Sequence, residues 1–122
     1  MGTWDFAPWE NDTAADWFAN IFNETSFANH IEEALKRDID EYPEVIRAAT
    51  AVLIMLGRLY VWPIEILEDH LKLAIGKMEL CVEAGVFADE TPLVEKEILT
   101  LKARLKDLKG SSEWERLVDI TQ

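Results

Sequence analysis

The sequence contains little of what enzymes and secreted domains use for chemistry or cross-linking. Its 122 residues include one cysteine, Cys81, and only two histidines, His30 and His70. A single cysteine cannot form an internal disulfide, and the start of the chain has neither the basic nor the apolar stretch of a signal peptide. We therefore expect a protein of the reducing cytoplasm.

Long apolar runs and glycine-rich turns are also missing. The longest apolar run, residues 48–56, is interrupted by Thr50 and has about half the roughly 20 residues that a membrane-spanning helix needs. It predicts a buried core helix and no membrane span. The five glycines are scattered, so the chain lacks the glycine-rich turn after a strand that cradles phosphate. A nucleotide-binding enzyme is not expected.

Basic residues are few. Twelve Lys and Arg stand against 24 Asp and Glu, which gives a formal net charge of −12 and a pI near 4.5. Such a field opposes unaided binding to nucleic acid or to an anionic membrane, so neither is expected as a partner. If charge selects the partner, the partner should be a basic protein.

Apolar residues recur at intervals of three and four along most of the chain, and no stretch alternates convincingly at two. The sequence therefore predicts an all-α fold and one domain over residues 1–122. That domain should comprise an extended aromatic arm at 1–11 and a bundle of about five to six helices at 12–122. The expected helices cover about 13–23, 27–42, 43–57, 63–84 and 91–109, with a last one from 112 onward.

Capping and stop signals set most of these boundaries. Thr13 and Ser26 are expected caps, with Asn11 and Asp12 as alternatives to Thr13, and Pro43 suits the first turn of the third helix. Gly110 is expected to end the fifth helix, and Ser112-x-x-Glu115 has the form of a capping box that would open a sixth. The fourth helix carries two apolar stripes, which predicts a central position in the bundle.

Aromatic residues crowd the start of the chain, where Trp4, Phe6 and Trp9 precede the first helix. We expect this arm to fold back on the helices and to bury Trp4 and Trp9, since exposed aromatics threaten solubility. The alternative is an exposed aromatic patch that binds a partner.

Nucleophilic catalysis needs a Ser or Cys beside an oriented base, and the sequence offers no good candidate. The three serines lie at expected caps or turns, and Cys81 lies on an apolar stripe, where a small buried side chain is expected. No catalytic residue and no cofactor are therefore predicted.

Metal sites in helical bundles often use a Glu-x-x-His pair, which this sequence lacks. The reversed pair His30 and Glu33, and the group Glu65, Glu68, Asp69 and His70, are the available alternatives. Since acids are abundant, we favour two partly exposed histidines beside apolar stripes and no metal ligand. A small metal-dependent or hydrolytic enzyme that uses His30 or His70 with nearby carboxylates remains the alternative.

Negative charge is concentrated in the first part of the chain. Residues 1–46 contain eleven acidic and two basic side chains, a net charge of −9. We expect a non-enzymatic interaction module of the immunity or inhibitor type that docks a basic partner. Two other interpretations remain. The acidic surface could serve only solubility, or the protein could be a structural homo-oligomeric domain. The candidate partner-binding residues are Glu32, Glu33, Asp38, Asp40, Glu41 and Glu44.

The opening Met1-Gly2-Thr3-Trp4, followed by Pro-Trp-Glu-Asn-Asp at residues 8–12, resembles that of a bacterial family catalogued as domain of unknown function family 4259. The similarity extends to the overall length and to the alanines of the third helix, Ala48, Ala49 and Ala51. Asp5 and Ala7 stand where the family usually has glycines. The resemblance implies a small bacterial cytoplasmic protein and supplies no activity or site.

Overall fold

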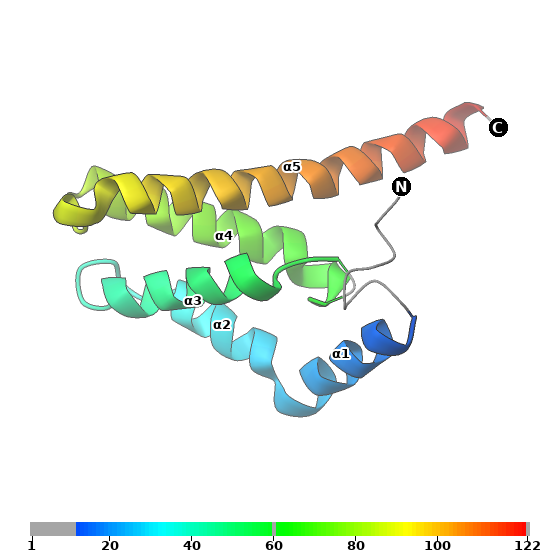
Figure 1. The fold of residues 1–122 in the computed structure, drawn as a ribbon, viewed down its shortest axis with the longest axis horizontal. Coiled ribbons are helices and arrows are strands. Elements are labelled where there is room, and N and C mark those ends of the chain that lie inside the picture. Colours follow the sequence, from blue (N-terminus) through cyan, green and yellow to red (C-terminus); the bar gives the residue numbers. More distant parts are fainter. Residues whose placement is uncertain (1–11, 60, 122) are drawn as a thin grey trace.

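The helical periodicity produces five α-helices in the computed structural model of the chain (Figure 1). The structure describes the backbone of residues 12–59 and 61–121 and the side chains of residues 12–59 and 61–108. These residues contain no strand, so the predicted all-α fold is confirmed. The helices are α1 (Asp12–Thr25), α2 (Phe27–Leu35), α3 (Pro43–Leu56), α4 (Ile64–Glu83) and α5 (Thr91–Thr121), and the short 3₁₀ helix η2 (Ala88–Glu90) precedes α5.

Pro43 begins α3 as predicted, but α2 ends at Leu35 and not near Tyr42, because the Asp38 carboxylate accepts the Asp40 amide and shapes a turn there instead of further helix. Pro43 is the first residue of α3, where its missing N–H costs no hydrogen bond. Gly57 ends α3, and its amide donates to the Leu53 carbonyl at 2.7 Å. A Cβ at Gly57 would lie 2.5 Å from that carbonyl oxygen, so glycine is required there. Gly85, with φ of +72°, follows α4.

Other expected helix ends differ from the prediction in whole or in part. Helix α1 begins at Asp12, so Thr13 lies inside it. Ser26 occupies the expected position directly before α2, but in a left-handed conformation and without a side-chain capping bond. Helix α5 does not end at Gly110 but continues unbroken to Thr121, and Ser112 opens no separate helix. A glycine inside a helix costs only about 1 kcal/mol relative to alanine, and the hydrogen-bonded turns on both sides offset it.

The predicted arm at residues 1–11, with Trp4 and Trp9, lies outside the described residues. Its expected burial therefore stays a prediction.

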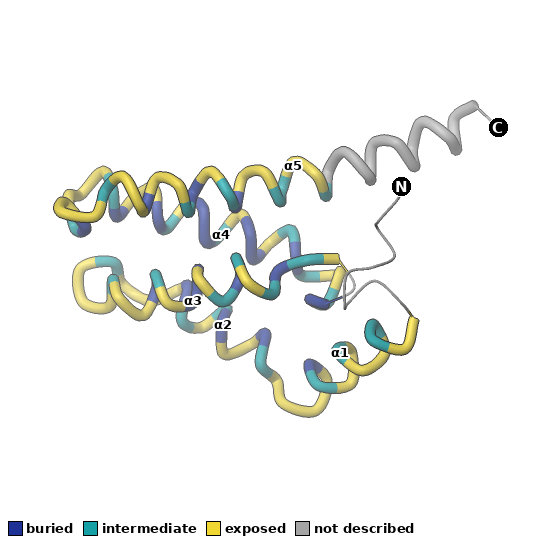
Figure 2. Tube along the Cα trace, in the orientation of Figure 1, coloured by how far each residue is buried: buried dark blue, intermediate teal, exposed yellow. Residues whose placement is uncertain are grey.

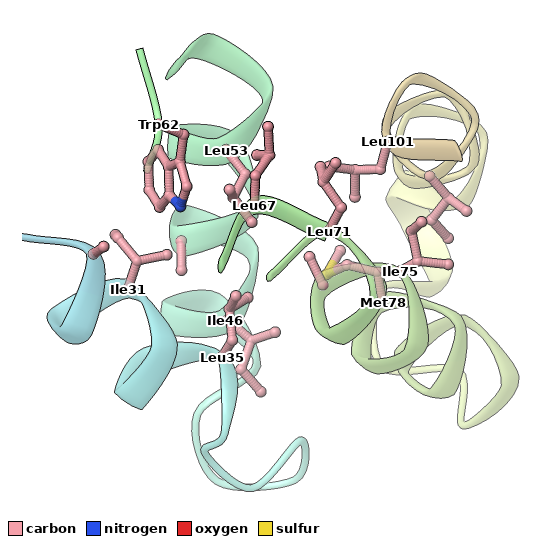
Figure 3. Close-up of a cluster of buried hydrophobic side chains, with 14 of the residues drawn as sticks. Ile31, Leu35, Ile46, Leu53, Trp62, Leu67, Leu71, Ile75, Met78 and Leu101 are labelled. Atoms are coloured by element: carbon pink, nitrogen blue, oxygen red, sulfur yellow. The ribbon is translucent and has the colours of Figure 1, made fainter. Parts of the chain in front are cut away.

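The core lies where α2, α3, α4 and α5 meet. Helix α4 packs against the other three, α3 does likewise, and α1 packs against α2. Figure 3 shows side chains from these helices converging, among them Leu35, Leu53, Leu71 and Leu101, which have no exposed surface. None of the helices in the described part of the chain has the length and apolar character to cross a bilayer.

The two apolar stripes of α4 differ in burial: the first is buried except for Ile64 at its start, and the second is partly exposed. The first stripe contributes Leu67, Leu71 and Met78 to the core. Along the second, Leu73 is half-buried and Leu80 is 49% exposed. The expectation that α4 is covered on two sides is therefore met only in part.

Helix α3 also differs from its expectation as a buried helix. One side, with Ile46 and Leu53, lies in the core, whereas Ala48, Ala51 and Met55 are exposed. Figure 2 shows the mixture of buried and exposed positions along this helix. An uncharged helical surface thus faces solvent.

Candidate functional site

His70 is buried in the structure, which corrects the prediction of a partly exposed side chain. It lies on α4 with 1% of its surface exposed. The Nε1–H of Trp62 donates to Nδ1 of His70 over 3.1 Å. Since an indole nitrogen can only donate, Nδ1 is the acceptor, and the neutral ring carries its hydrogen on Nε2. That nitrogen lies 2.9 Å from Oε1 of Glu32 on α2 and donates to it.

The Glu32 carboxylate completes this polar cluster. Its second oxygen accepts a hydrogen bond from Lys36 at 2.9 Å. The hydrogen bond from His70 is the largest influence that lowers the pKa of Glu32, and Lys36 adds to it. Both ring nitrogens of His70 are therefore engaged within the protein. The cluster links α2 and the segment before α4 to α4 through hydrogen bonds. Neither ring nitrogen of His70 is left free to act as a base.

The other predicted metal or catalytic candidates do not come together. Glu65 and Asp69 lie on the exposed side of α4, whereas His70 faces the core, and Glu68 pairs with Lys72 at 2.7 Å. His30 is exposed on α2. In the described part of the chain, no three His, Cys, Asp or Glu side chains are grouped so that they could hold a metal ion.

Cys81 is the buried side chain that its place on an apolar stripe predicted. None of its surface is exposed, and burial raises the pKa of its thiol. A buried, protonated thiol is a poor nucleophile.

Five of the six predicted partner-binding acids are exposed. Glu33 lies on α2, Asp38, Asp40 and Glu41 lie in the turn between α2 and α3, and Glu44 lies in the first turn of α3. The amide of Asp40 donates to the Asp38 carboxylate at 2.7 Å, which shapes the turn. Glu32 differs from the others because its carboxylate points to His70.

This acidic turn lies beside an open pocket of about 750 Å³ between α3 and the α4–α5 connection. We call it the acidic pocket. Its apolar lining comes from Pro43, Ala48, Ala51, Val86, Phe87 and Ala88, and its charged lining from Glu44, Arg47, Asp89, Glu90 and Glu97.

Arg47 is the only basic side chain in the lining of the acidic pocket, and it is fully paired. Its Nε and Nη2 bind the two oxygens of Glu97 at 3.1 and 2.8 Å, and its Nη1 lies 3.4 Å from Glu90. The guanidinium also lies over the Phe87 ring at 5.4 Å. The hydrogen bonds to Glu97 raise the pKa of Arg47. One cation among four carboxylates leaves the pocket with an excess of negative charge.

The sequence predicted only Glu44 among the charged residues of this pocket. Arg47 and its partners Glu90 and Glu97 are 43 and 50 positions apart, and no local pattern connects them. Only the packing of the α4–α5 connection beside α3 reveals that the acidic surface extends to Asp89 and Glu90.

Comparison with known proteins gives one match. The model of a family described as Domain of unknown function (DUF4259) matches residues 2–56. No curated protein and no solved structure matches the chain. The matched segment includes α1, α2, α3 and the acidic turn, whereas α4, η2 and α5 lie beyond it.

Proposed function

Since this chain belongs to the DUF4259 family, a domain of unknown function, we propose its function from its own surface: it is a protein-interaction module that docks a basic partner at the acidic pocket. Among the described residues, no three His, Cys, Asp or Glu side chains are grouped so that they could hold a metal ion. A binding role is the function that the geometry supports best.

The composition of the acidic pocket carries this proposal. Its lining combines apolar side chains, Ala48, Ala51 and Phe87 among them, with the carboxylates of Glu44 and Asp89. Contact with the apolar lining provides affinity, and the carboxylates attract and orient a cation. A lysine or arginine side chain fits both features, because it combines an aliphatic stem with a charged end.

The neighbouring acidic turn extends the same electrostatic surface. Asp38, Asp40 and Glu41 are exposed immediately before α3, next to the pocket residues Pro43 and Glu44. A basic surface that binds the pocket would also face this turn. By covering such a surface, the protein would act as an immunity or inhibitor module for a partner that uses positive charge.

A peptide-display selection tests the proposal. Random peptides are selected on the wild-type protein, and their affinity is then measured for the double variant Glu44→Lys/Asp89→Lys. The control is Glu65→Lys/Asp69→Lys, which changes net charge equally at two exposed positions of α4. We expect selected peptides to pair Lys or Arg with an apolar residue and to bind the pocket variant about tenfold or more weakly, a loss of roughly 1.4 kcal/mol.

Binding to the control should stay close to wild type, and high salt should weaken wild-type binding as the screening length falls from about 10 Å at 0.1 M to about 3 Å at 1 M. Peptides that bind both variants equally, or that lack basic residues, would refute a partner-docking role for this pocket.

A further inference from the structure

A second open pocket lies between α4 and α5, which run side by side in Figure 1. Its volume is about 550 Å³, within the range of about 300 to 1,000 Å³ that is typical of binding pockets. We call it the α4–α5 groove. Its apolar lining comes from Val82, Ile98 and Leu99, and its charged lining from Glu79, Glu83, Glu95 and Lys102.

The apolar lining includes a side chain that the core does not use. Ile98 belongs to the core, and half-buried Val82 packs against it. Leu99 is 65% exposed, the largest fraction among the large apolar side chains that the structure describes. Because Leu99 lies beside further apolar side chains in a hollow, another apolar surface that covers it would gain free energy.

The charged lining is mostly acidic and only partly paired. Lys102 is its one basic residue, and its Nζ lies 2.8 Å from a carboxylate oxygen of Glu79. Glu83 on α4 and Glu95 on α5 are exposed, and neither forms an ion pair within the described part of the chain. Three carboxylates and one ammonium group leave the groove with an excess of negative charge.

Glu83 lies where the helix itself already contributes negative charge. It is the last residue of α4, and the last turn of this helix contains no basic residue. Since the C-terminus of a helix carries partial negative charge, a carboxylate there is unfavourable and a cation is favourable. A basic partner would supply the cation that this last turn lacks.

We propose that the α4–α5 groove binds an amphipathic helix of a partner protein, one with an apolar face flanked by Lys or Arg. The apolar face covers Leu99 and Val82, and the basic side chains pair with the carboxylates of Glu83 and Glu95. A neutral or acidic segment would leave both carboxylates unpaired beside buried apolar surface, which is costly. A second copy of this chain, with its formal charge of −12, is disfavoured for the same reason.

The position of the groove favours a helix over an extended segment. Two helices form it, and a third helix fits between them when rows of side chains interlock. A helix also pairs its own backbone groups, whereas an extended segment would place unpaired N–H and C=O groups against the apolar lining. Apolar residues three and four positions apart would therefore anchor the partner.

The α4–α5 groove and the acidic pocket lie on different sides of α5 and have no lining residue in common. Successive residues of a helix point about 100° apart, so Glu95 in the groove and Glu97 in the pocket point in nearly opposite directions. Binding at one surface does not depend on binding at the other.

Methyl NMR spectra of the full chain, titrated with a synthetic peptide, test the proposal. The peptide has about 14 residues, or four helical turns, with Leu recurring at intervals of three and four and Lys elsewhere. We expect the chemical shift changes to concentrate at Val82, Ile98 and Leu99, with little change at Val86 in the acidic pocket. A peptide with Glu in place of each Lys, and one with a helix-breaking central proline, should each bind about tenfold or more weakly.

Variants of the protein separate contact with the groove from a general effect of charge. Leu99→Ala and the double variant Glu83→Gln/Glu95→Gln should each weaken binding about tenfold at about 0.1 M salt. The matched control, Glu65→Gln/Asp69→Asn, removes two charges from exposed positions near the other end of α4 and should stay within about twofold of wild type. Circular dichroism establishes that all variants remain folded.

Three results would overturn the proposal. Equal affinity for the Lys and Glu peptides, or for the wild type and the groove variants, excludes recognition by these residues. Shift changes concentrated at Val86 place the peptide in the acidic pocket, which would support the docking function and leave the groove without a ligand. A rise in affinity of about tenfold after deletion of residues 2–11 means that the start of the chain, and not a partner, occupies the groove.

Discussion

The indole of Trp62 donates its only hydrogen to Nδ1 of His70, so two side chains eight positions apart satisfy each other inside the core. Both are nearly inaccessible, at 2% and 1% exposure. The Trp62 ring also packs edge-on against Phe22 of α1 and Phe27 of α2. This single residue therefore connects the first two helices to the start of α4.

Replacing His70 by phenylalanine should destabilise the fold. The substitution keeps a ring in the core but leaves the Trp62 N–H without an acceptor, which costs about 1 to 3 kcal/mol for a buried donor. Urea denaturation measures the loss. His30→Phe is the control, because His30 is exposed and a surface change is worth about 0.5 kcal/mol or less. Equal stability of the two variants would contradict a structural role for the Trp62–His70 hydrogen bond.

Glu32 should make stability depend on acid. Its pKa in the folded protein lies below the ordinary value of 4.5, mainly because of the hydrogen bond with His70. Folding therefore gains from the ionised carboxylate above pH 4.5, and this gain is lost as the pH falls through the lowered pKa. Compared by urea denaturation, wild type should exceed Glu32→Gln in stability at neutral pH, and the difference should shrink in acid. A difference that is constant down to about pH 3 would exclude this linkage.

Two glycines should respond to alanine in opposite directions. At Gly57 the new Cβ would meet the Leu53 carbonyl oxygen at 2.5 Å, so Gly57→Ala should lower stability by about 1 to 3 kcal/mol, as other overpacked substitutions do. At Gly76, inside α4, nothing lies within 4 Å of the new Cβ, and Gly76→Ala should raise stability by about 1 kcal/mol through helix propensity. Melting temperatures that shift in the same direction would contradict this reasoning.

Arg104 should stabilise the end of α3. Its Nη2 donates to the Ile54 carbonyl at 2.8 Å, and burial, followed by the like charge of Arg58, lowers the pKa of Arg104. Arg104→Met removes this hydrogen bond and a cation at a helix C-terminus, and should cost about 1 kcal/mol by urea denaturation. Lys106→Met, an exposed change two positions away, should be close to neutral. A neutral Arg104→Met would show that water caps α3 equally well.

Local patterns predicted the helices well because each depends on its own neighbours in sequence. The fit of Pro43 to a first helical turn is a local property, and this prediction holds. The position of His70 could have been inferred from its spacing, since it follows Leu67 by three and precedes Ala74 by four, both of which are buried. The identity of its partners could not, because Glu32 is 38 positions away.

The difference between local patterns and contacts between distant residues also explains why the acidic pocket and the end of α5 were not fully predicted. Glu44 belongs to a run of acids in the sequence, so it could be predicted. Asp89 joins the lining of the acidic pocket only because two distant segments of the chain lie side by side. Gly110 is a stop signal by composition, but glycine only weakens a helix and does not forbid it. Its neighbours decide the outcome, and here the helix continues.

The core also constrains how this fold can be divided. The family match ends at residue 56, the last residue of α3, yet Leu35, Ile46 and Leu53 reach full burial beside Leu67 and Leu71 of α4. The described part of this segment, residues 12–56, therefore contributes only part of a hydrophobic core that α4 and α5 complete. Any protein that shares this segment needs an apolar helix in the place of α4, from its own chain or from another, and that helix can differ in sequence as long as it covers the same surface.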